Sequence, residues 1–333
     1  MVRKGSTAPA FLITIDTEGD GLWDRPTQVT TRNVRELPRF QELCERYRLK
    51  PTYVATYEAA ADPIYQDFAR DALRRDVAEV GMHLHAWNSP PLYDLTGDDR
   101  AHLPYLVEYP EDIIRLKATF LTELLEDTLQ TKMLSHRAGR WTFDAHYMNV
   151  LVELGYEVDC SVTPHVSWRS CAGDPNGQGG SDYTHYPTCA YFPDPNDLSI
   201  PGDSPLLEVP MTVVARTPLL RLSRLGIVPA GSLLGRALPC FATPWFRPNR
   251  WNHRRLCALL RRAIAEQWDY VMLMLHSSEL LAGANPTFRT ETHIQALYDL
   301  LEQLFDLAGS RCEGLTLSEY RRRVVDRRLS SRG

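Results

Sequence analysis

Apolar and polar positions follow two different periods along this chain. Residues 10–16 (AFLITID) form a short, mostly apolar run, which is typical of a strand buried on both faces. Residues 31–49 instead place apolar side chains three or four positions apart, which is the period of an amphipathic helix. The two patterns repeat, so that further strands are expected at 50–57, 78–87, 131–141, 157–163 and 269–276, and further helices at 64–76, 110–130, 144–156, 252–268 and 291–308. This alternation predicts parallel strands joined by crossover helices, which is an α/β fold.

One long segment, at about 165–250, interrupts the alternation. It is dense in Gly, Pro, Asp and Asn, the residues of turns and loops, and we weigh a hairpin within 206–215. Long structured insertions in α/β folds usually serve function, and we expect this one to cover the active face. The pattern resumes after it, and 314–324 reads as a last strand and helix. Without an internal repeat or a clear linker, residues 1–333 are expected to form a single, barrel-like domain.

Composition narrows the class of protein. The chain has 333 residues, 44% of them hydrophobic, and a formal net charge of −5, which argues against a nucleic-acid partner. No stretch is long enough to span a membrane, and the first 20 residues do not read as a signal peptide. The basic run near the C-terminus is expected to be a solvated helix face, with peripheral contact to an anionic membrane as the alternative. The oligomeric state is not indicated.

Cysteine usage bears on the compartment. There are seven cysteines at scattered positions and no C-x-x-C pair, so zinc-finger and thioredoxin-like sites are not indicated. Reduced thiols fit this pattern best, and we therefore expect a cytoplasmic protein.

Chemistry-bearing side chains follow the expected strands at their carboxyl ends. His83 and His85 are two residues apart on one strand, so both point to the same face. The corresponding positions of the other strands hold Asp16, Glu18, Asp20, His136, Arg137, Arg140, Asp159, Ser161 and His276. Functional residues of parallel α/β folds gather at these ends, and carboxylate together with imidazole suits a divalent metal ion.

These positions resemble the motifs of the polysaccharide deacetylase family, the NodB homology fold of carbohydrate esterase family 4. The resemblance rests on TIDTEGD (14–20), on His83, on RAGRW (137–141) and on VMLMLHSSEL (271–280), and it covers roughly 10–165 and 268–320. It implies a distorted (β/α)7-type barrel that hydrolyses N-acetyl groups with one divalent metal ion.

Three positions depart from the family pattern. Thr17 stands where a second Asp is usual, so the ligand role passes to Glu18, with Asp20 as the alternative. Trp87 stands where the family keeps its second metal-binding His, and His85 would have to replace it. Gly139 stands where Pro is common.

The resemblance also implies roles for individual residues. Glu18, His83 and His85 would bind the metal, with zinc as the first choice and cobalt, nickel or iron as alternatives. Asp16 would be the catalytic base, kept ionised by Arg137, and His276 would protonate the departing nitrogen. Asp159 would orient His276. Substrate contacts are expected from Arg140, Trp87, Trp141 and Trp168, although packing in the core is an equal alternative for Trp87 and Trp141.

The expected function is therefore a metal-dependent de-N-acetylase. Its substrate would be an N-acetylated sugar or oligosaccharide, in a precursor of O-antigen or exopolysaccharide. One alternative is a different amide hydrolase on the same fold, such as a deformylase or an allantoinase-like enzyme. The other is a catalytically impaired sugar-binding module, which the missing H-x-x-x-H spacing would explain.

Overall fold

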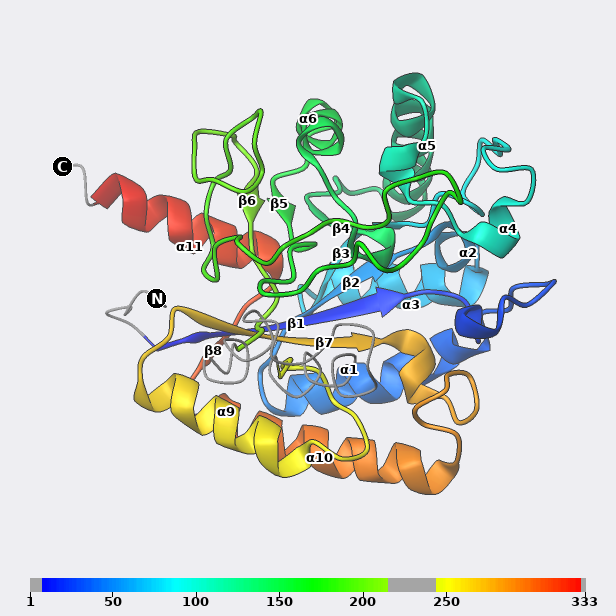
Figure 1. Ribbon diagram of the computed structural model, residues 1–333. Coiled ribbons are helices and arrows are strands. Elements are labelled where there is room, and N and C mark those ends of the chain that lie inside the picture. The colour runs from blue at the N-terminus through cyan, green and yellow to red at the C-terminus, as the bar shows by residue number, and fades with distance from the viewer. Residues whose placement is uncertain (1–7, 215–243, 331–333) are drawn as a thin grey trace, which may run out of the picture.

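A single parallel sheet forms the centre of the computed structural model, which describes residues 8–214 and 244–330 (Figure 1). Within these ranges the strand order is β6-β5-β4-β3-β2-β1-β7, and β8 pairs with the beginning of β1. All of these pairings are parallel. The strands are β1 (Ala10–Thr17), β2 (Pro51–Ala55), β3 (Glu79–Leu84), β4 (Ser135–Ala138), β5 (Val158–Asp159), β6 (Leu207–Glu208), β7 (Tyr270–His276) and β8 (Glu313–Gly314).

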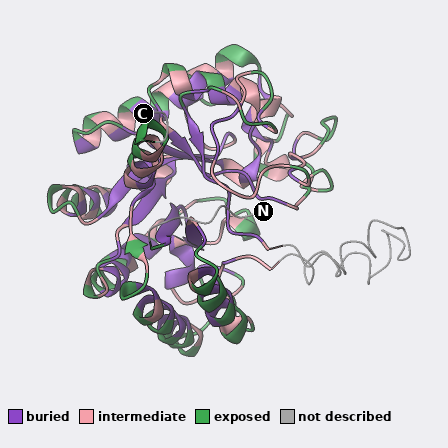
Figure 2. Ribbon diagram, turned by 90° about the vertical axis from the view of Figure 1, so that its left-hand side faces the viewer, coloured by how far each residue is buried: buried purple, intermediate pink, exposed green. Residues whose placement is uncertain are grey.

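Helices connect the strands and surround the sheet. Figure 2 shows the buried strands inside a ring of helices that turn exposed faces outward. The helices are α1 (Leu37–Arg46), α2 (Tyr57–Ala60), α3 (Pro63–Arg74), α4 (Asp99–His102), α5 (Glu111–Leu129), α6 (Ala145–Glu153), α9 (His253–Ala265), α10 (Glu291–Gly309) and α11 (Leu317–Ser330). The alternation read from the sequence is therefore present in the structure.

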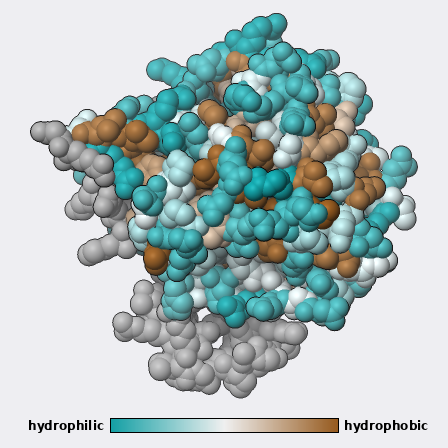
Figure 3. Space-filling view, turned by 90° about the horizontal axis from the view of Figure 1, so that it is seen from above, coloured by the Kyte–Doolittle hydropathy of each residue, from teal (hydrophilic) through white to brown (hydrophobic). Residues whose placement is uncertain are grey.

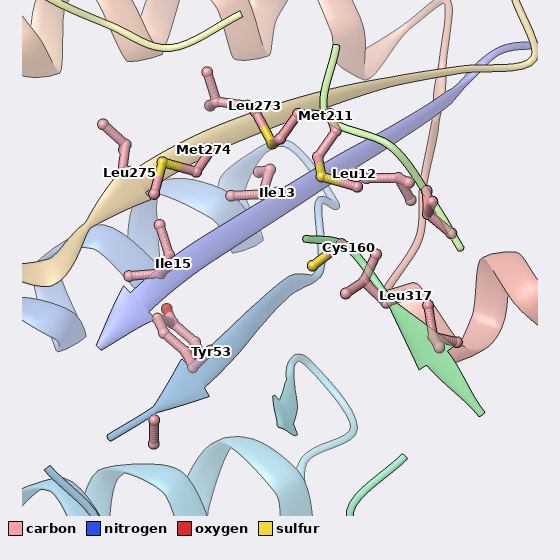
Figure 4. Close-up of a cluster of buried hydrophobic side chains, with 14 of the residues drawn as sticks. Leu12, Ile13, Ile15, Tyr53, Cys160, Met211, Leu273, Met274, Leu275 and Leu317 are labelled. Carbon is pink, nitrogen blue, oxygen red and sulfur yellow. The ribbon is translucent and has the colours of Figure 1, made fainter. Parts of the chain in front are cut away.

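The centre of the core lies along β1 and β7. Every residue of β1 is buried, because β2 and β7 flank it and apolar side chains cover both of its faces. Figure 4 shows Ile13 and Ile15 of β1 in one buried cluster with Leu273 and Leu275 of β7, their partners in register. Removing such side chains from water stabilises the fold by about 1.5–3 kcal/mol each. This rigid pair of strands carries Asp16 and His276 at its carboxyl end.

The two described ends of the 165–250 segment fill the gap between β6 and β7. The backbone N–H of Met272 donates to Thr212 Oγ1 over 2.9 Å, and the Tyr270 hydroxyl donates to the Pro210 carbonyl over 2.5 Å. Phe246 N–H donates to the Thr212 carbonyl over 2.9 Å. Irregular chain thus satisfies the free edge of β7 where a regular barrel would have another strand. The expected distorted (β/α)7-type barrel is confirmed.

The hairpin weighed within 206–215 is wrong for the described residues. Leu207 and Glu208 form β6 and pair in parallel with Val158 and Asp159 of β5. Leu206 and Leu207 are buried against the barrel at this edge, and their burial outweighs the turn signals in the sequence around them. The segment therefore contributes to the sheet as well as to the loops above it.

The surface seen in Figure 3 is largely hydrophilic, with hydrophobic side chains scattered between polar ones. Among the residues that the structure describes, no helix has both the length and the apolarity needed to cross a membrane. Six cysteines lie in the described ranges and are free, and Cys240 lies outside them.

Candidate active site

A cavity of about 330 Å³ opens where the carboxyl ends of β1, β3, β4 and β7 converge. Strand register brings its floor together, because Asp16 of β1 is the partner of His276 of β7, and His83 of β3 is the partner of Arg137 of β4. The cavity is lined by Asp16, Glu18, Leu22, Trp23, His83, His85, Trp87, Leu103, Tyr105, Ala138, Arg140, Trp141, Trp168, Cys171, Arg247 and His276.

Asp16 is held by an arginine that crosses the barrel interior. Arg137 is fully buried, and its guanidinium donates to Asp16 Oδ1 and, over 2.7 Å, to Thr14 Oγ1. Burial alone would raise the pKa of Asp16, but the positive charge of Arg137, with smaller contributions from His83 and His276, lowers it to about 2. Asp16 is therefore ionised at neutral pH, and its Oδ2 lies 3.7 Å from His83 Nε2 and 3.8 Å from His276 Nε2.

Glu18, His83 and His85 form a buried group beside Asp16. Each offers one ligand atom, and these atoms all lie within 4.8 Å of one another. His83 Nδ1 lies 2.8 Å from the Arg137 carbonyl oxygen, to which it donates, so the lone pair of the neutral ring is on Nε2, toward the group. Burial lowers the pKa of His83 to about 4 and that of His85 well below its usual value, so both rings are neutral at pH 7.

A divalent cation fits this group. Burial raises the pKa of Glu18 well above its usual value, and the negative charges of Asp16 and Glu58 raise it further, so a nearby cation would be needed to favour its ionised form. His85 Nε2 faces the group and lies 3.7 Å from Glu18 Oε2, a separation that one ion bound to both atoms could span. One carboxylate and two neutral imidazoles are a donor set for zinc and related ions, and three protein ligands leave room for a reactant.

Asp20, the alternative ligand, is engaged elsewhere. Its carboxylate accepts from Thr30 Oγ1 over 2.7 Å, from Arg32 N over 2.9 Å and from Asn33 N over 3.1 Å. These bonds fix the loop that follows β1. Asp20 is not a member of the Glu18–His83–His85 group, and both of its oxygens accept hydrogen bonds within that loop, so Glu18 stays the carboxylate that we propose as the ligand.

The ring of His85 sits in a slot between Trp87 and Gly139. It stacks on Trp87 with the ring centroids 4.5 Å apart and an interplanar angle of 18°. A Cβ atom at position 139 would lie 2.3 Å from the Leu84 carbonyl oxygen and 2.6 Å from His85 Cδ2, closer than atoms can approach. Two of the three departures from the family pattern, Gly139 and Trp87, therefore flank His85, the residue proposed to replace the missing histidine.

His276 is oriented by Arg247 and Glu279. Arg247 Nη2 lies 2.6 Å from His276 Nδ1, and because a guanidinium only donates, Nδ1 accepts and the proton of the neutral ring is on Nε2. Nε2 faces the cavity, 3.7 Å from Glu18 Oε1. Glu279 accepts from Arg247 Nη2 over 2.9 Å and from His276 N over 2.9 Å. Burial raises the pKa of Glu279, but Arg247 and His276 outweigh it and lower that pKa to about 2.

Asp159 does not orient His276, so this expectation is wrong. Its carboxylate pairs with His136 Nδ1 at 2.6 Å and accepts from the backbone N–H and hydroxyl of Ser161 over 2.7 and 2.8 Å. Both oxygens are thus occupied inside the sheet at β4 and β5. His136, for which no role was expected, is the partner that Asp159 has instead. Their network supports the end of β4, because Ala138 N–H donates to Ser161 Oγ over 2.8 Å.

The expected substrate-contacting residues all line the cavity. Trp141 is only 8% exposed and packs edge-on against Trp245, with the ring centroids 5.6 Å apart. It is therefore both a core residue and part of the cavity wall. Trp87 and Trp168 are half-buried. The Arg140 guanidinium donates to the carbonyl oxygens of Leu103 and Ala172 and lies 4.2 Å over the Tyr105 ring, so it ties two loops to the wall.

Several residues of the site are not predicted from the sequence. Arg247 comes from a loop next to no expected strand, and no motif marks it. Trp23 contacts His276 edge-on, with ring centroids 5.1 Å apart, but it lies beyond the first strand. Glu279 does have a signal in the sequence, because it stands three residues after His276, the last residue of a strand. From that position its carboxylate can accept a hydrogen bond from the His276 backbone N–H and close the turn.

Comparison with known proteins supports the fold. No protein-family profile matches the chain, and no curated protein matches its sequence. Among solved structures, a protein assigned as a polysaccharide deacetylase from Mycobacterium smegmatis is similar with a TM-score of 0.55 and 16% identity, over 98% of this chain and 94% of the other. A protein assigned as a glycoside hydrolase/deacetylase from Parabacteroides distasonis has a TM-score of 0.61 and 11% identity, over 96% of this chain and 71% of the other.

A third similar structure is the allantoinase PuuE, with a TM-score of 0.50 and 15% identity, over 95% of this chain and 90% of the other. At these identities the likeness establishes the architecture. The chain therefore has the polysaccharide-deacetylase type of barrel, and its chemistry has to be argued from its own site.

Proposed function

We propose that this protein is a metal-dependent hydrolase that removes the acetyl group from an N-acetylated amino sugar. The observation that carries the proposal is the buried Glu18–His83–His85 group next to the ionised Asp16, at the floor of a cavity with aromatic walls. We assign Glu18, His83 and His85 as ligands of one divalent ion, zinc in the first instance. The finer substrate class that we propose is a precursor of a surface polysaccharide such as O-antigen or exopolysaccharide.

Asp16 is placed to act as the base. A divalent ion held by the three ligands would polarise the acetyl carbonyl and lower the pKa of water. Asp16 Oδ1 is occupied by Arg137, so Oδ2, which faces His83 and His276, is the oxygen that accepts the proton of the attacking water. Arg137 keeps Asp16 ionised for this step and holds it in position from the interior.

His276 faces Asp16 across the cavity and presents its Nε2–H there. Arg247 fixes this proton on Nε2, which we assign as the donor to the departing nitrogen. The reaction balances with water alone. Water oxygen bonds to the acyl carbon as its first proton passes to Asp16, and the carbon–nitrogen bond breaks as His276 gives its Nε2 proton to the nitrogen. The proton on Asp16 then replaces the one that His276 gave, and the water's second proton reaches the amine as acetate leaves.

The aromatic walls favour a sugar. Trp23, Trp87 and Trp168 line the cavity with partly accessible rings, and flat apolar faces beside a few polar groups are suited to a ring that has both C–H faces and hydroxyl groups. The likeness to an allantoinase fold favours a second candidate, hydrolysis of another non-peptide carbon–nitrogen bond. A substrate panel separates the two candidates.

The test is product release from such a panel. Wild type, Asp16→Asn and His276→Ala are incubated with N-acetylated amino sugars and their oligomers, N-formylated sugars and cyclic ureides. His146→Ala serves as the control, because His146 lies on α6 and does not line the cavity. We expect acetate from the N-acetyl sugars with wild type and the control, and at least a 100-fold loss in both site variants. A wild-type protein that releases ammonia or formate instead, or acts on cyclic ureides alone, would establish the second candidate.

A further inference from the structure

A second cavity, of about 240 Å³, adjoins the catalytic one. Arg247 lines both cavities and so forms the wall between them. The second cavity is otherwise built from residues 244–252, the first turn of α9, and the segment after β7, including Arg255, Glu279 and Thr287. A substrate whose reacting sugar lies against Asp16 and His276 would place its neighbouring unit at Arg247 and beyond.

Arg247 has hydrogen-bonding capacity left for a ligand. Its Nη2 donates to His276 Nδ1 and Glu279 Oε1 over 2.6 and 2.9 Å. Its Nε and Nη1 have no acceptor among the described residues, although only 26% of the side chain is exposed. A guanidinium whose Nε and Nη1 keep three unused N–H bonds is well suited to a carboxylate or phosphate, whose oxygens match its fork.

Arg255 adds a second positive charge to the same cavity. It lies in the first turn of α9, where the helix dipole disfavours a cation, and that turn contains no acidic residue. It is exposed and has no ion pair among residues 8–214 and 244–330. Its position is therefore not explained by the stability of the helix.

The Glu279 carboxylate and the Asn252 amide of the second cavity are already engaged. Glu279 is the carboxylate there, and its two oxygens accept from Arg247 and from His276 N. Asn252 Nδ2 donates to the Arg247 carbonyl over 2.7 Å, and Asn252 Oδ1 accepts from Asn249 N over 2.9 Å. Two arginines against one carboxylate leave the cavity with a net positive charge.

We propose that this second cavity is a subsite for an acidic group, a carboxylate or a phosphate, on the unit joined to the N-acetylated sugar. The inference rests on the proposed function and narrows its substrate to an acidic saccharide. Arg247 has two roles in it, since one nitrogen orients His276 and the remaining donors bind the acidic group. Arg255 acts only on the substrate.

The test compares three substrates that share the N-acetylglucosamine unit. They are the neutral disaccharide N,N′-diacetylchitobiose, a disaccharide of N-acetylglucosamine and glucuronate, and N-acetylglucosamine 1-phosphate. The proteins are wild type, Arg255→Gln and Arg254→Gln, the last being a matched loss of charge at a neighbouring exposed residue that does not line the cavity. Acetate release gives kcat and KM, and binding of each compound to Asp16→Asn protein is measured by calorimetry.

For wild type we expect an acidic compound to have at least a tenfold higher kcat/KM than the neutral disaccharide. Arg255→Gln should lower that value about five- to twentyfold through KM, leave the neutral disaccharide unchanged, and differ from Arg254→Gln. Which acidic compound is preferred distinguishes a carboxylate from a phosphate. Equal values for acidic and neutral compounds, or equal effects of the two arginine exchanges, would overturn the subsite.

The binding measurement separates this inference from the proposed function. If wild type releases no acetate from any compound, the proposed hydrolysis fails. The subsite is then decided by affinity alone. Tighter binding of an acidic compound to Asp16→Asn protein, lost on adding Arg255→Gln, would support it, and equal affinities would overturn it.

Discussion

At the scale of single residues, the ion pair of Asp16 and Arg137 sets the protonation state of the proposed base. Arg137→Met would leave Asp16 buried without its partner, so the pKa of Asp16 would rise and the acid limb of kcat/KM would move to higher pH. We expect activity at neutral pH to fall at least 100-fold and the free energy of unfolding to fall by about 3–5 kcal/mol.

The matched control for this exchange is Arg169→Met. Arg169 forms an ion pair with Asp182 at 3.7 Å, but its side chain is 71% exposed. Such a pair contributes about 0–1 kcal/mol, so the control should change neither activity nor the pH profile. An Arg137→Met protein whose acid limb stays in place would show that Arg137 does not govern the base.

Glu279 gives a prediction about stability against pH. Its pKa is about 2 in the folded protein and near 4.5 when unfolded, so its ionised form contributes stability above pH 4.5 that is lost as pH falls toward 2. Glu279→Gln should therefore lower the free energy of unfolding by roughly 2–3 kcal/mol at pH 7, and the gap to wild type should close on acidification. Urea unfolding at pH 7, 5, 4 and 3 measures it.

The control here is Glu123→Gln, an exposed position on α5. It should track wild type at every pH. A Glu279→Gln gap that is constant from pH 7 to 3 would mean that its effect comes from packing and not from ionisation.

At the scale of elements, helix α5 anchors the segment that follows β3. Lys117 is fully buried, and its ammonium donates to the carbonyl oxygens of Ser89 and Pro91 over 2.7 Å each. That segment begins with His85 and Trp87, so Lys117 acts on the proposed metal ligand through the backbone. Burial lowers the pKa of Lys117 to about 8.

Lys117→Met would leave both carbonyl oxygens without a donor. We expect the free energy of unfolding to fall by about 2–4 kcal/mol and metal affinity to fall with it, measured by urea unfolding and by zinc titration. Lys132→Met is the control, since Lys132 is 80% exposed and pairs with Glu126 on the surface. If Lys117→Met binds zinc as tightly as wild type, the segment is held by other contacts.

The elements also show what the sequence could reveal. Apolar runs identify β1 and β7, and same-face alternation identifies His83 and His85, because each signal lies within one element. The sequence does not predict β6, because this strand has only two residues and pairs with a strand almost 50 positions earlier in the chain. The Asp159 error has the same origin: a carboxylate at a strand end can meet any neighbouring imidazole, and only the packed structure chooses His136.

At the scale of the whole molecule, the barrel brings four strand ends and the insertion to one cavity. β1, β3, β4 and β7 provide the floor, and the segments around Trp168 and Arg247 provide the wall. Arg137 connects opposite sides of the barrel interior, because its side chain reaches from β4 to Asp16 of β1 and contacts Met211 and Met272. The chemistry is therefore a property of the curled sheet and the segments packed on it, rather than of any one motif.

The most direct measurement of the central claim is a zinc titration of metal-stripped protein, with bound metal and acetate release from an N-acetylglucosamine oligomer determined in the same samples. We expect no activity without metal, a linear rise that ends at one equivalent, and a higher melting temperature in the loaded protein. His83→Ala should bind no stoichiometric zinc, whereas Asp16→Asn should bind it and remain inactive. Activity that survives stripping, or one bound equivalent with no turnover of any N-acetylated sugar, would contradict the account.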